Sequence, residues 1–400
     1  MLTLLADQPE CLWDDALPIE VKELPEDLAA LDALLCDPEL LWPIVERWRQ
    51  EFEQTGRLVL TEGRPTIAME TYIRLMVLKA RYRWGYRTLV AEVSDSIHLR
   101  RFCRISLTER VPDESTPRRL TRRIGSETVA EMTRALLEAA VRQKRFRPRA
   151  VRIDSTVIEA DVKYPTDAGL ASSGVRVLAG EGRKLARRKA RGRGARAKLK
   201  AAASLEESAD RCEKVARQIR QRVAGEPIKD RLVSLFDPDA RPIRKGKLGK
   251  PNEFGFVSQV AEVTENTKPG ARGLILPAST ELGNPAEDTL LPGTVAELQR
   301  LGISVQEVAV DGGFNTGPTN SALEDIQPKN VFIAGRQEPG SKRTQRRLRR
   351  YRTGAEGRIS HLKRRYGLDR SRLKGDEGRQ IWTEWSILAY NADTLGVRER

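Results

Sequence analysis

Apolar residues recur at two different spacings along the chain, and the spacing changes near residue 150. Between residues 64 and 145 they return every three or four positions, the spacing of amphipathic helices. Over residues 150–158 they alternate with polar residues and many are β-branched, which predicts a strand. The chain therefore combines an N-terminal helical part with a later part that contains a sheet.

The helical part divides into two segments. Residues 1–60 contain short helical patterns broken by prolines, with a helix expected over 42–52, and we interpret them as a helical N-terminal arm of undecided role. Residues 61–146 are expected to form a helical domain. Within it, Ser115 as a cap and Pro117 in the first turn predict a helix start, and a further helix follows from about Ser126.

The helix predicted to begin at Ser115 is rich in arginine. Short helices with a basic member resemble helix-turn-helix DNA readers, but an ordinary helical bundle with a solvated basic face has the same pattern. The charge of the whole chain helps the DNA interpretation without excluding the other. The candidate DNA-binding residues on this helix are Arg118, Arg119, Arg122 and Arg123.

From residue 147 onward the pattern predicts strands alternating with helices, and hence an α/β fold. A helix is expected over about 285–300 and another over about 379–395. Residues 165–228 interrupt the pattern, loop-like to residue 182, densely basic to residue 200 and helical afterwards. We expect a catalytic domain over 147–400, interrupted by a basic helical insertion at 165–228. The expected strands cover residues 150–158, 231–236, 254–263, 305–310 and 330–334.

Charge narrows the choice of partner. The chain of 400 residues has 71 Lys and Arg against 56 Asp and Glu, a net charge of +15, which favours a polyanion such as nucleic acid. Four scattered cysteines and two histidines argue against a zinc site, a disulfide framework or a Ser-His-Asp triad. No apolar run has membrane-spanning length and no signal peptide is evident, so we expect a cytoplasmic protein without a membrane partner.

Two aspartates occupy unusual positions in the predicted strands. Asp154 lies in the middle of the first strand, where a buried carboxylate needs a partner or a metal. Asp311 follows an apolar run and precedes two glycines, at the strand tip where α/β proteins often place their chemistry. The alternatives are an edge-strand aspartate facing water and an ordinary turn aspartate. Asp237 and Asp239 are rival acids, but their Asp-Pro context is typical of a turn.

A third acid lies on a predicted helix near the C-terminal end. At 100° per residue, Arg352, Glu356 and Lys363 lie close together beside a narrow apolar stripe. This arrangement suits metal binding next to phosphate, although a surface helix with an i,i+4 ion pair gives the same pattern. Three acids on separate elements that converge could hold two divalent ions and drive phosphodiester chemistry.

The chain resembles bacterial insertion-sequence transposases of the DDE type. The resemblance covers roughly residues 64–395, and it depends on the order and spacing of several motifs rather than on one of them. In many of these enzymes the last motif reads Tyr-x2-Arg-x3-Glu-x6-Lys; here Arg349 stands at the tyrosine position. The motifs are 154–160 (DSTVIEA), 237–246 (DPDARPIRKG), 309–314 (AVDGGF), 352–363 (RTGAEGRISHLK) and 388–391 (LAYN).

The resemblance implies a ribonuclease H-like catalytic domain with a mixed five-stranded sheet. It implies that Asp154, Asp311 and Glu356 form a catalytic triad holding two Mg²⁺ (or Mn²⁺) ions, with Arg352 and Lys363 at the DNA phosphates. The reaction would be cleavage at the ends of an insertion sequence, followed by joining of the 3′-hydroxyl ends to target DNA. The implied partners are double-stranded DNA, as terminal inverted repeats and target, and a second copy in a homodimer at the bacterial nucleoid.

Two alternatives stay open at this point. The chain could be an inactivated or repurposed transposase that only binds DNA, because sequence does not show that the three acids meet. It could also be a two-metal nuclease without strand transfer.

Overall fold

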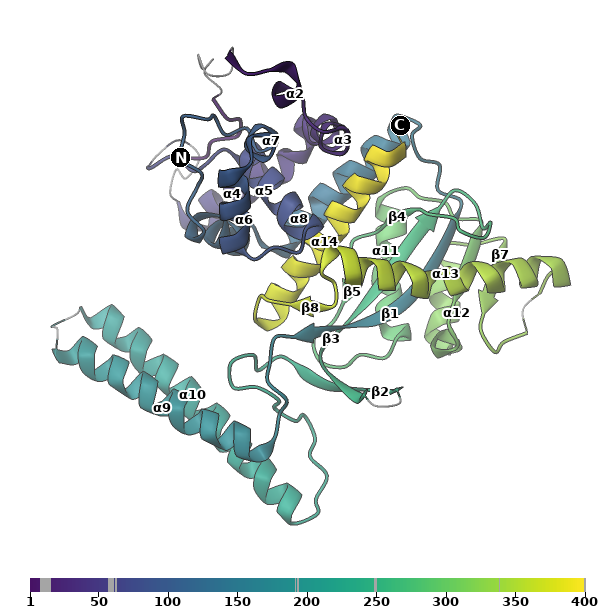
Figure 1. Cartoon of the computed structure of the whole chain (residues 1–400). Helices are drawn as coiled ribbons and strands as arrows, with labels where there is room; N and C mark the ends of the chain where they lie inside the picture. Colours follow the sequence, from purple (N-terminus) through teal and green to yellow (C-terminus); the bar gives the residue numbers. More distant parts are fainter. Residues whose placement is uncertain are drawn as a thin grey trace.

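A mixed sheet with helices on both faces forms one part of the protein, and a cluster of helices forms the other (Figure 1). The computed structural model describes residues 1–7, 16–56, 61, 63–190, 192, 194–247, 250–337 and 339–398. Within them the sheet has eight strands. The predicted α/β class with an N-terminal helical part is confirmed. None of the helices in these ranges is long and apolar enough to cross a membrane.

The sheet is organised around one long central strand, β1 (Ala150–Ala160). Five strands form a continuous path in the order β2-β3-β1-β6-β7, with β1 antiparallel to β3 and parallel to β6. Short strands β4 and β5 pair with β3, and β8 pairs with β1. The other strands are β2 (Arg241–Lys247), β3 (Lys250–Thr264), β4 (Leu274–Ile275), β5 (Ser279–Thr280), β6 (Glu307–Val310), β7 (Asn330–Ile333) and β8 (Arg370–Ser371).

One predicted strand is wrong. Residues 231–236 are not a strand, and the strand at this place in the sheet is β2, ten residues further on. The Leu232 backbone is occupied instead by one side chain, because Gln218 accepts from its N–H at 2.6 Å and donates to its carbonyl at 3.2 Å. Leu232 and Leu235 then pack beside Val215, so the β-like apolar pattern serves a helix contact.

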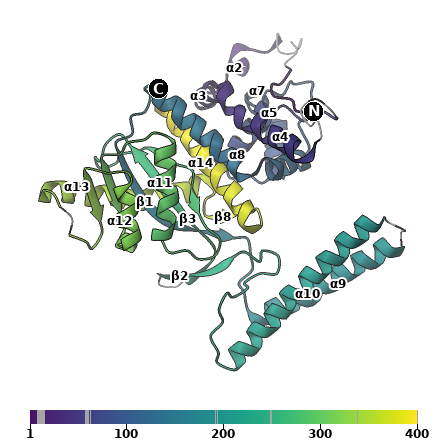
Figure 2. The same cartoon turned by 180° about the vertical axis from the view of Figure 1, so that it is seen from behind.

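Both faces of β1 are covered, which explains its nearly continuous burial. Helix α13 (Lys342–Tyr366) crosses one face, and helices α11 (Leu291–Arg300) and α12 (Gly317–Glu324) cover the other (Figures 1 and 2). Ala150 belongs to the cluster on the α13 face, with Tyr351 of that helix. Val151 and Ile153 point the other way into the main core.

The main core is shared by the N-terminal helices and the sheet. Leu31, Trp48 and Leu78 belong to the same buried cluster as Val260 of β3 and Leu388. Leu388 lies on α14 (Gly375–Arg398), which packs against α3, α5 and α8 as well as β4. The N-terminal helices are α2 (Ile19–Lys22), α3 (Glu26–Leu35), α4 (Trp42–Thr55), α5 (Met69–Arg81), α6 (Tyr86–Asp95), α7 (Ile97–Phe102) and α8 (Ser115–Arg142), with a 3-10 turn η1 (Pro38–Leu40).

Helix α8 contains the two helices expected from residues 115 and 126. They run together in one element that is interrupted at Gly125, whose φ of 80° and ψ of 176° are not helical. The predicted serine cap is wrong: the Asp113 carboxylate accepts the Ser115 N–H at 2.9 Å. After the interruption, Glu377 of α14 accepts from the Ser126 N–H at 2.9 Å and so caps the second segment.

The insertion forms a helical hairpin of α9 (Asp167–Ala190) and α10 (Ala195–Val223), which projects away from the sheet (Figures 1 and 2). Residues 201–223 are helical as expected, but the loop expected up to residue 182 is wrong, because α9 covers these residues. Gly174 lies against the Cys212 sulfur, 3.1 Å from where a Cβ would be. Glycine at 174 therefore permits a close approach of the two helices.

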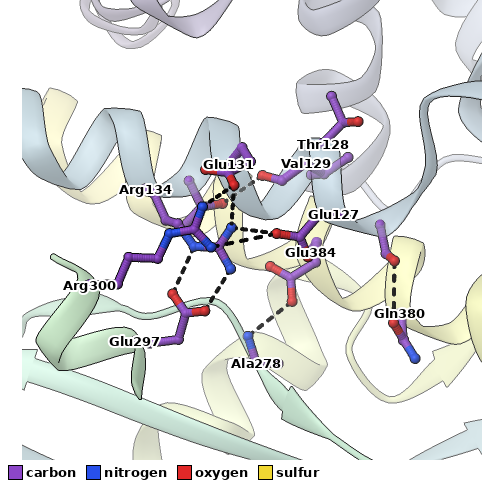
Figure 3. A network of polar contacts seen from close by, with 12 residues as sticks. Glu127, Thr128, Val129, Glu131, Arg134, Ala278, Glu297, Arg300, Gln380 and Glu384 are labelled. Carbon is purple, nitrogen blue, oxygen red and sulfur yellow. Dashed lines mark hydrogen bonds and ion pairs between the residues drawn. The ribbon is translucent and has the colours of Figure 1, made fainter. Parts of the chain in front are cut away.

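A network of ion pairs joins the second segment of α8 to the sheet part (Figure 3). Arg134 is almost fully buried and donates to both carboxylate oxygens of Glu297 on α11, at 2.8 and 2.6 Å. It also pairs with Glu127 at 2.8 Å and Glu131 at 3.1 Å. The planar guanidinium thus fixes α8 against α11 with geometrically specific contacts.

Glu384 of α14 lies beside this network without a strong partner. One of its carboxylate oxygens accepts the Ala278 N–H at 3.0 Å, whereas Oε2 is buried without a hydrogen bond. Burial raises the pKa of Glu384 from 4.5 to about 8. At neutral pH the group is therefore mostly protonated in the folded protein.

The Glu384 side chain predicts a pH-dependent stability. Because its folded-state pKa exceeds that of the unfolded chain, its contribution is largest below pH 4.5 and is lost as the pH rises through about 8. We expect Glu384→Gln to become progressively more stable than the wild type over that window, by at most about 5 kcal/mol at 1.36 kcal/mol per pKa unit. Denaturant midpoints at pH 5 to 9 measure this; a constant difference across the range would contradict it.

Candidate functional site

The register of the sheet places Asp154 beside Asp311. Arg152 of β1 and Ala309 of β6 are the last pair of a parallel ladder, and Asp154 and Asp311 each follow two residues later, near enough for the Asp311 charge to raise the pKa of Asp154. Neighbouring strands lie about 4.8 Å apart. Two of the three predicted acids are therefore brought together by backbone pairing alone.

Each of these two carboxylates is oriented by the N–H that follows it. Asp154 Oδ1 accepts from Ser155 N at 2.8 Å, and Asp311 Oδ1 accepts from Gly312 N at 2.7 Å. Asp311 also begins the 3-10 turn η3 (Gly312–Phe314), and its side chain is 47% exposed. The pair thus lies at the end of β6 and is open to solvent on the Asp311 side.

The third acid is carried over the sheet by α13, which a buried ion cluster fixes in place. Glu262 of β3 is 0% exposed and pairs with Arg152 at 2.6 Å and with Arg358 of α13 at 2.9 Å. Both guanidiniums are almost completely buried as well. A buried carboxylate between two guanidiniums tolerates little displacement, because each lost contact leaves an uncompensated charge.

Close packing of α13 on β1 requires the glycine of the motif. Arg152 donates to the Tyr351 carbonyl at 3.1 Å, one turn before Ala355 enters the core. A Cβ on Gly354 would overlap the Arg152 guanidinium. A side chain at 354 would therefore displace the Arg152 guanidinium from its present position.

Arg352 connects the second and third acids. Its guanidinium lies 3.5 Å from Asp311 Oδ1 and 3.1 Å from Glu356 Oε1. Its own side chain is 15% exposed, whereas Glu356 is 67% exposed. The predicted triad and the predicted phosphate contact Arg352 thus occupy one site, with the arginine between two of the acids.

The surroundings of Asp154 disfavour its charged form. Burial raises its pKa from 3.8 to about 6, and the carboxylates of Glu287 and Asp311 add to the rise. The Ser155 N–H and Arg352 oppose it. Burial is the main cause of the raised pKa, and a bound cation would favour the charged form of Asp154.

Glu287 is an acid of the site that the sequence did not indicate. It acts on Asp154 electrostatically, and a Cβ on Gly313 would overlap its carboxylate. Gln259 of β3 is fully buried and donates to the Glu287 carbonyl at 2.9 Å, which holds the loop against the sheet. Because Glu287 precedes the 3-10 turn η2 (Asp288–Leu290) in an irregular loop, no periodicity distinguished it from other loop acids.

Lys363 extends the same edge of α13 along β1. Its Nζ donates to the Val157 carbonyl at 2.8 Å, three residues beyond Asp154. The lysine is thus placed beside the strand that carries the first acid, as the helical spacing from Arg352 indicated. Its contact with phosphate stays a prediction.

The carboxylates of Asp154, Asp311 and Glu356 are the groups that could bind a divalent ion. Carboxylate oxygens suit Mg²⁺ and Mn²⁺, and the carboxylates of Glu287 and Asp311 lie near enough to Asp154 to raise its pKa. As the side chains stand, however, no group of three or more His, Cys, Asp or Glu residues in the described ranges is arranged to hold a metal. Glu356 pairs with Arg352 instead. The residues suit a divalent ion in chemistry, and occupancy requires Glu356 to exchange its partner.

The four arginines of α8 lie in different surroundings. Arg119 and Arg122 are exposed, and Arg118 is exposed while it pairs with Glu114 at 3.1 Å. Arg123 is only half-exposed, and it pairs with Glu51 at 2.9 Å and lies over the Trp48 ring of α4. Arg123 therefore has a packing role in the helical part, whereas the DNA contacts predicted for the group remain untested.

Asp237 and Asp239, the alternative acids, bind the backbone of another element. Asp237 accepts the Gly375 N–H and Asp239 the Asp376 N–H, both at 3.1 Å, so they bind the N-terminal end of α14. This agrees with their interpretation as turn residues. Glu159 pairs with Arg370 at 3.0 Å, at the far end of β1 from Asp154.

The buried ion cluster predicts a large stability effect. Glu262→Gln leaves two buried guanidiniums without their carboxylate, and we expect a loss of about 3–5 kcal/mol in unfolding free energy. Glu39→Gln is the control, because Glu39 makes a solvent-exposed pair with Arg142 and should leave the midpoint nearly unchanged. Chemical denaturation measures both; equal effects of the two variants would show that the cluster does not hold α13.

Asp154 predicts opposite responses to pH and to metal. Its folded-state pKa of about 6 exceeds the ordinary 3.8, so the wild type should lose stability relative to Asp154→Asn as the pH rises through this window. The difference is at most about 3 kcal/mol. Millimolar Mg²⁺ should then raise the melting temperature of the wild type more than that of the variant. Equal metal shifts would remove Asp154 from the ion site.

Comparison with known proteins bears on the helical part. Residues 26–123 match the family model described as Transposase domain (DUF772). This range runs from the start of α3 to Arg123 in α8, so it includes the arginine-rich segment but not the sheet. No curated protein and no solved structure gives a significant match to the chain. The match supports a transposase family, on the evidence of the N-terminal helices.

Proposed function

We propose that the protein is a DDE transposase that cuts DNA at the ends of an insertion sequence and joins the 3′-hydroxyl ends to target DNA. The observation that carries the proposal is the proximity of Asp154 to Asp311, which follows β6, with Glu356 linked to Asp311 through Arg352. Carboxylates from three separate elements thus lie near one another. The match of residues 26–123 to a transposase domain supports the same function independently.

The topology supports a ribonuclease H-like form for the catalytic part. The central strand β1 is antiparallel to β3 and parallel to β6, in the order β2-β3-β1-β6-β7. A helix that crosses this sheet, α13, carries the last acid. We infer that the acids act at this edge of the sheet and that the basic residues of α13 lie along the path of the DNA.

In this proposal Asp154, Asp311 and Glu356 would hold two Mg²⁺ or Mn²⁺ ions. Bound ions of this kind activate the attacking water or 3′-hydroxyl and stabilise the leaving oxygen. Arg352 would turn from Glu356 toward a phosphate oxygen, which its planar guanidinium suits. Lys363, beside Val157, would contact the backbone further along the strand. Glu287 would hold negative charge beside Asp154 and so favour cation binding.

One observation favours a second candidate, a repurposed transposase that only binds DNA. Arg352 neutralises Asp311 and Glu356 directly, and no group of acids in the described ranges is placed as a metal site. A protein that retained this arrangement on DNA would bind phosphates without cleaving them. Strand cleavage in the presence of a divalent ion separates the two candidates.

The experiment is a nicking assay on plasmid DNA that carries the sequences flanking the gene, with Mg²⁺ or Mn²⁺. We expect Asp154→Asn, Asp311→Asn and Glu356→Gln each to lower strand cleavage at least about a hundredfold, because each removes a ligand worth several kcal/mol of transition-state stabilisation. DNA binding by these variants should persist. Joined products in the wild-type reaction would distinguish a transposase from a nuclease.

Asp325→Asn is the matched control, since Asp325 is an exposed aspartate at the end of α12. It should cleave like the wild type. Full cleavage by any one of the three acid variants would remove that residue from the triad. DNA binding without cleavage by the wild type, under every divalent ion tried, would favour the binding-only candidate.

A further inference from the structure

The two helices of the α9–α10 hairpin are joined by side-chain contacts at its base. Arg222 pairs with Asp167 at 3.0 Å, which joins the start of α9 to the end of α10. Arg211 donates to the Leu235 carbonyl at 3.1 Å, and Gln218 holds both polar groups of the Leu232 backbone. The base of the hairpin is therefore held together internally and against the segment that follows it.

The two helices stay together along their whole length. Leu170 and Val215 are buried near the base, and Ala201 is buried near the tip. Close to the turn, Arg188 donates to the Ala197 carbonyl at 2.8 Å. With 24 residues in α9 and a rise of about 1.5 Å per residue, the hairpin is about 36 Å long.

Positive charge is concentrated at the far end of this hairpin. Residues 183–200 contain ten basic residues and no acid, whereas residues 201–223 contain five basic and four acidic residues. The tip side chains of Arg187, Lys189 and Arg196 are exposed. A surface made only for solubility would not need one sign of charge at one end.

We propose that this hairpin tip, residues 183–190 and 194–200, binds the phosphate backbone of duplex DNA at a distance from the acidic site. The inference rests on the proposed function, which supplies the DNA. Closely spaced exposed cations without intervening acids match the charge density of a duplex. The hairpin is about 36 Å long, about one turn of B-DNA, so on a duplex lying along the hairpin a contact at the tip would fall about one turn from its base.

A second copy of the chain is the alternative partner of the hairpin tip. The first fifty residues of the chain are acidic, so the tip of one copy could contact this segment of another. The uniform positive charge favours DNA, because the acidic segment is interspersed with buried apolar residues such as Leu31 and Ile44 that the main core already uses. The two occupants differ in their response to salt, to DNA length and to protein concentration.

The test compares two double variants in binding random-sequence duplexes of about 10 and about 40 base pairs. Arg187→Gln with Arg196→Gln removes two exposed charges from the tip. Arg217→Gln with Arg220→Gln removes two exposed charges from α10 nearer the base. Fluorescence anisotropy over a salt series, without metal, gives the affinities and avoids any dependence on cleavage.

We expect the tip variant to bind the long duplex more weakly, with a salt slope smaller by about 1.8, or about 0.9 for each lost phosphate contact. The loss relative to the wild type should therefore shrink about tenfold between about 50 and 200 mM salt. The short duplex should distinguish the variants less than the long one, and the base variant should resemble the wild type on both.

Equal salt slopes for the wild type and the tip variant would overturn the inference, as would equal losses in the tip and base variants. A tip variant with unchanged DNA binding but altered sedimentation would assign the surface to a second copy instead. The nicking assay distinguishes failure of the proposed function, because a wild type that cleaves while the tip variant binds normally overturns only the role of the hairpin.

Discussion

The buried contact of Glu262 with Arg152 and Arg358 fixes helix α13 against the sheet. It joins β3, β1 and α13 through one carboxylate that is wholly removed from water. Such a cluster is costly to bury, and it is favourable only in one geometry, so it acts as a locator more than as a source of stability. From that anchor, α13 presents Arg352 and Glu356 above the end of β6.

The site combines a rigid pair of acids with a more exposed third one. Asp154 and Asp311 are positioned by strand pairing and by their own backbone contacts, whereas Glu356 lies at the exposed surface of a helix. Arg352 links the two kinds of position. This division gives the sheet edge a fixed negative charge and leaves one carboxylate able to change partners by side-chain rotation alone.

Sequence predicted what depends on local pattern. Helical spacing identified α4 and both segments of α8, and β-alternation identified β1 with Asp154 inside it. The acids were proposed from motif order, but their side-by-side register in space is a non-local pairing that spacing cannot supply. Glu287 was missed because a loop acid has no period. The strand predicted over residues 231–236 is wrong because hydrogen bonds from the Gln218 side chain take the place of the expected backbone pairing.

Helix α14 has a consequence for how the chain is made. It packs against α3, α5 and α8, which precede it by more than two hundred residues in sequence. During synthesis, the N-terminal helices therefore emerge long before the surface that closes their core, and their apolar faces must wait for residues 375–398. Contacts of such long sequence separation form late and slowly. A chain that ends before residue 375 would lack the helix that covers these apolar faces, and exposed apolar surface of this kind promotes aggregation.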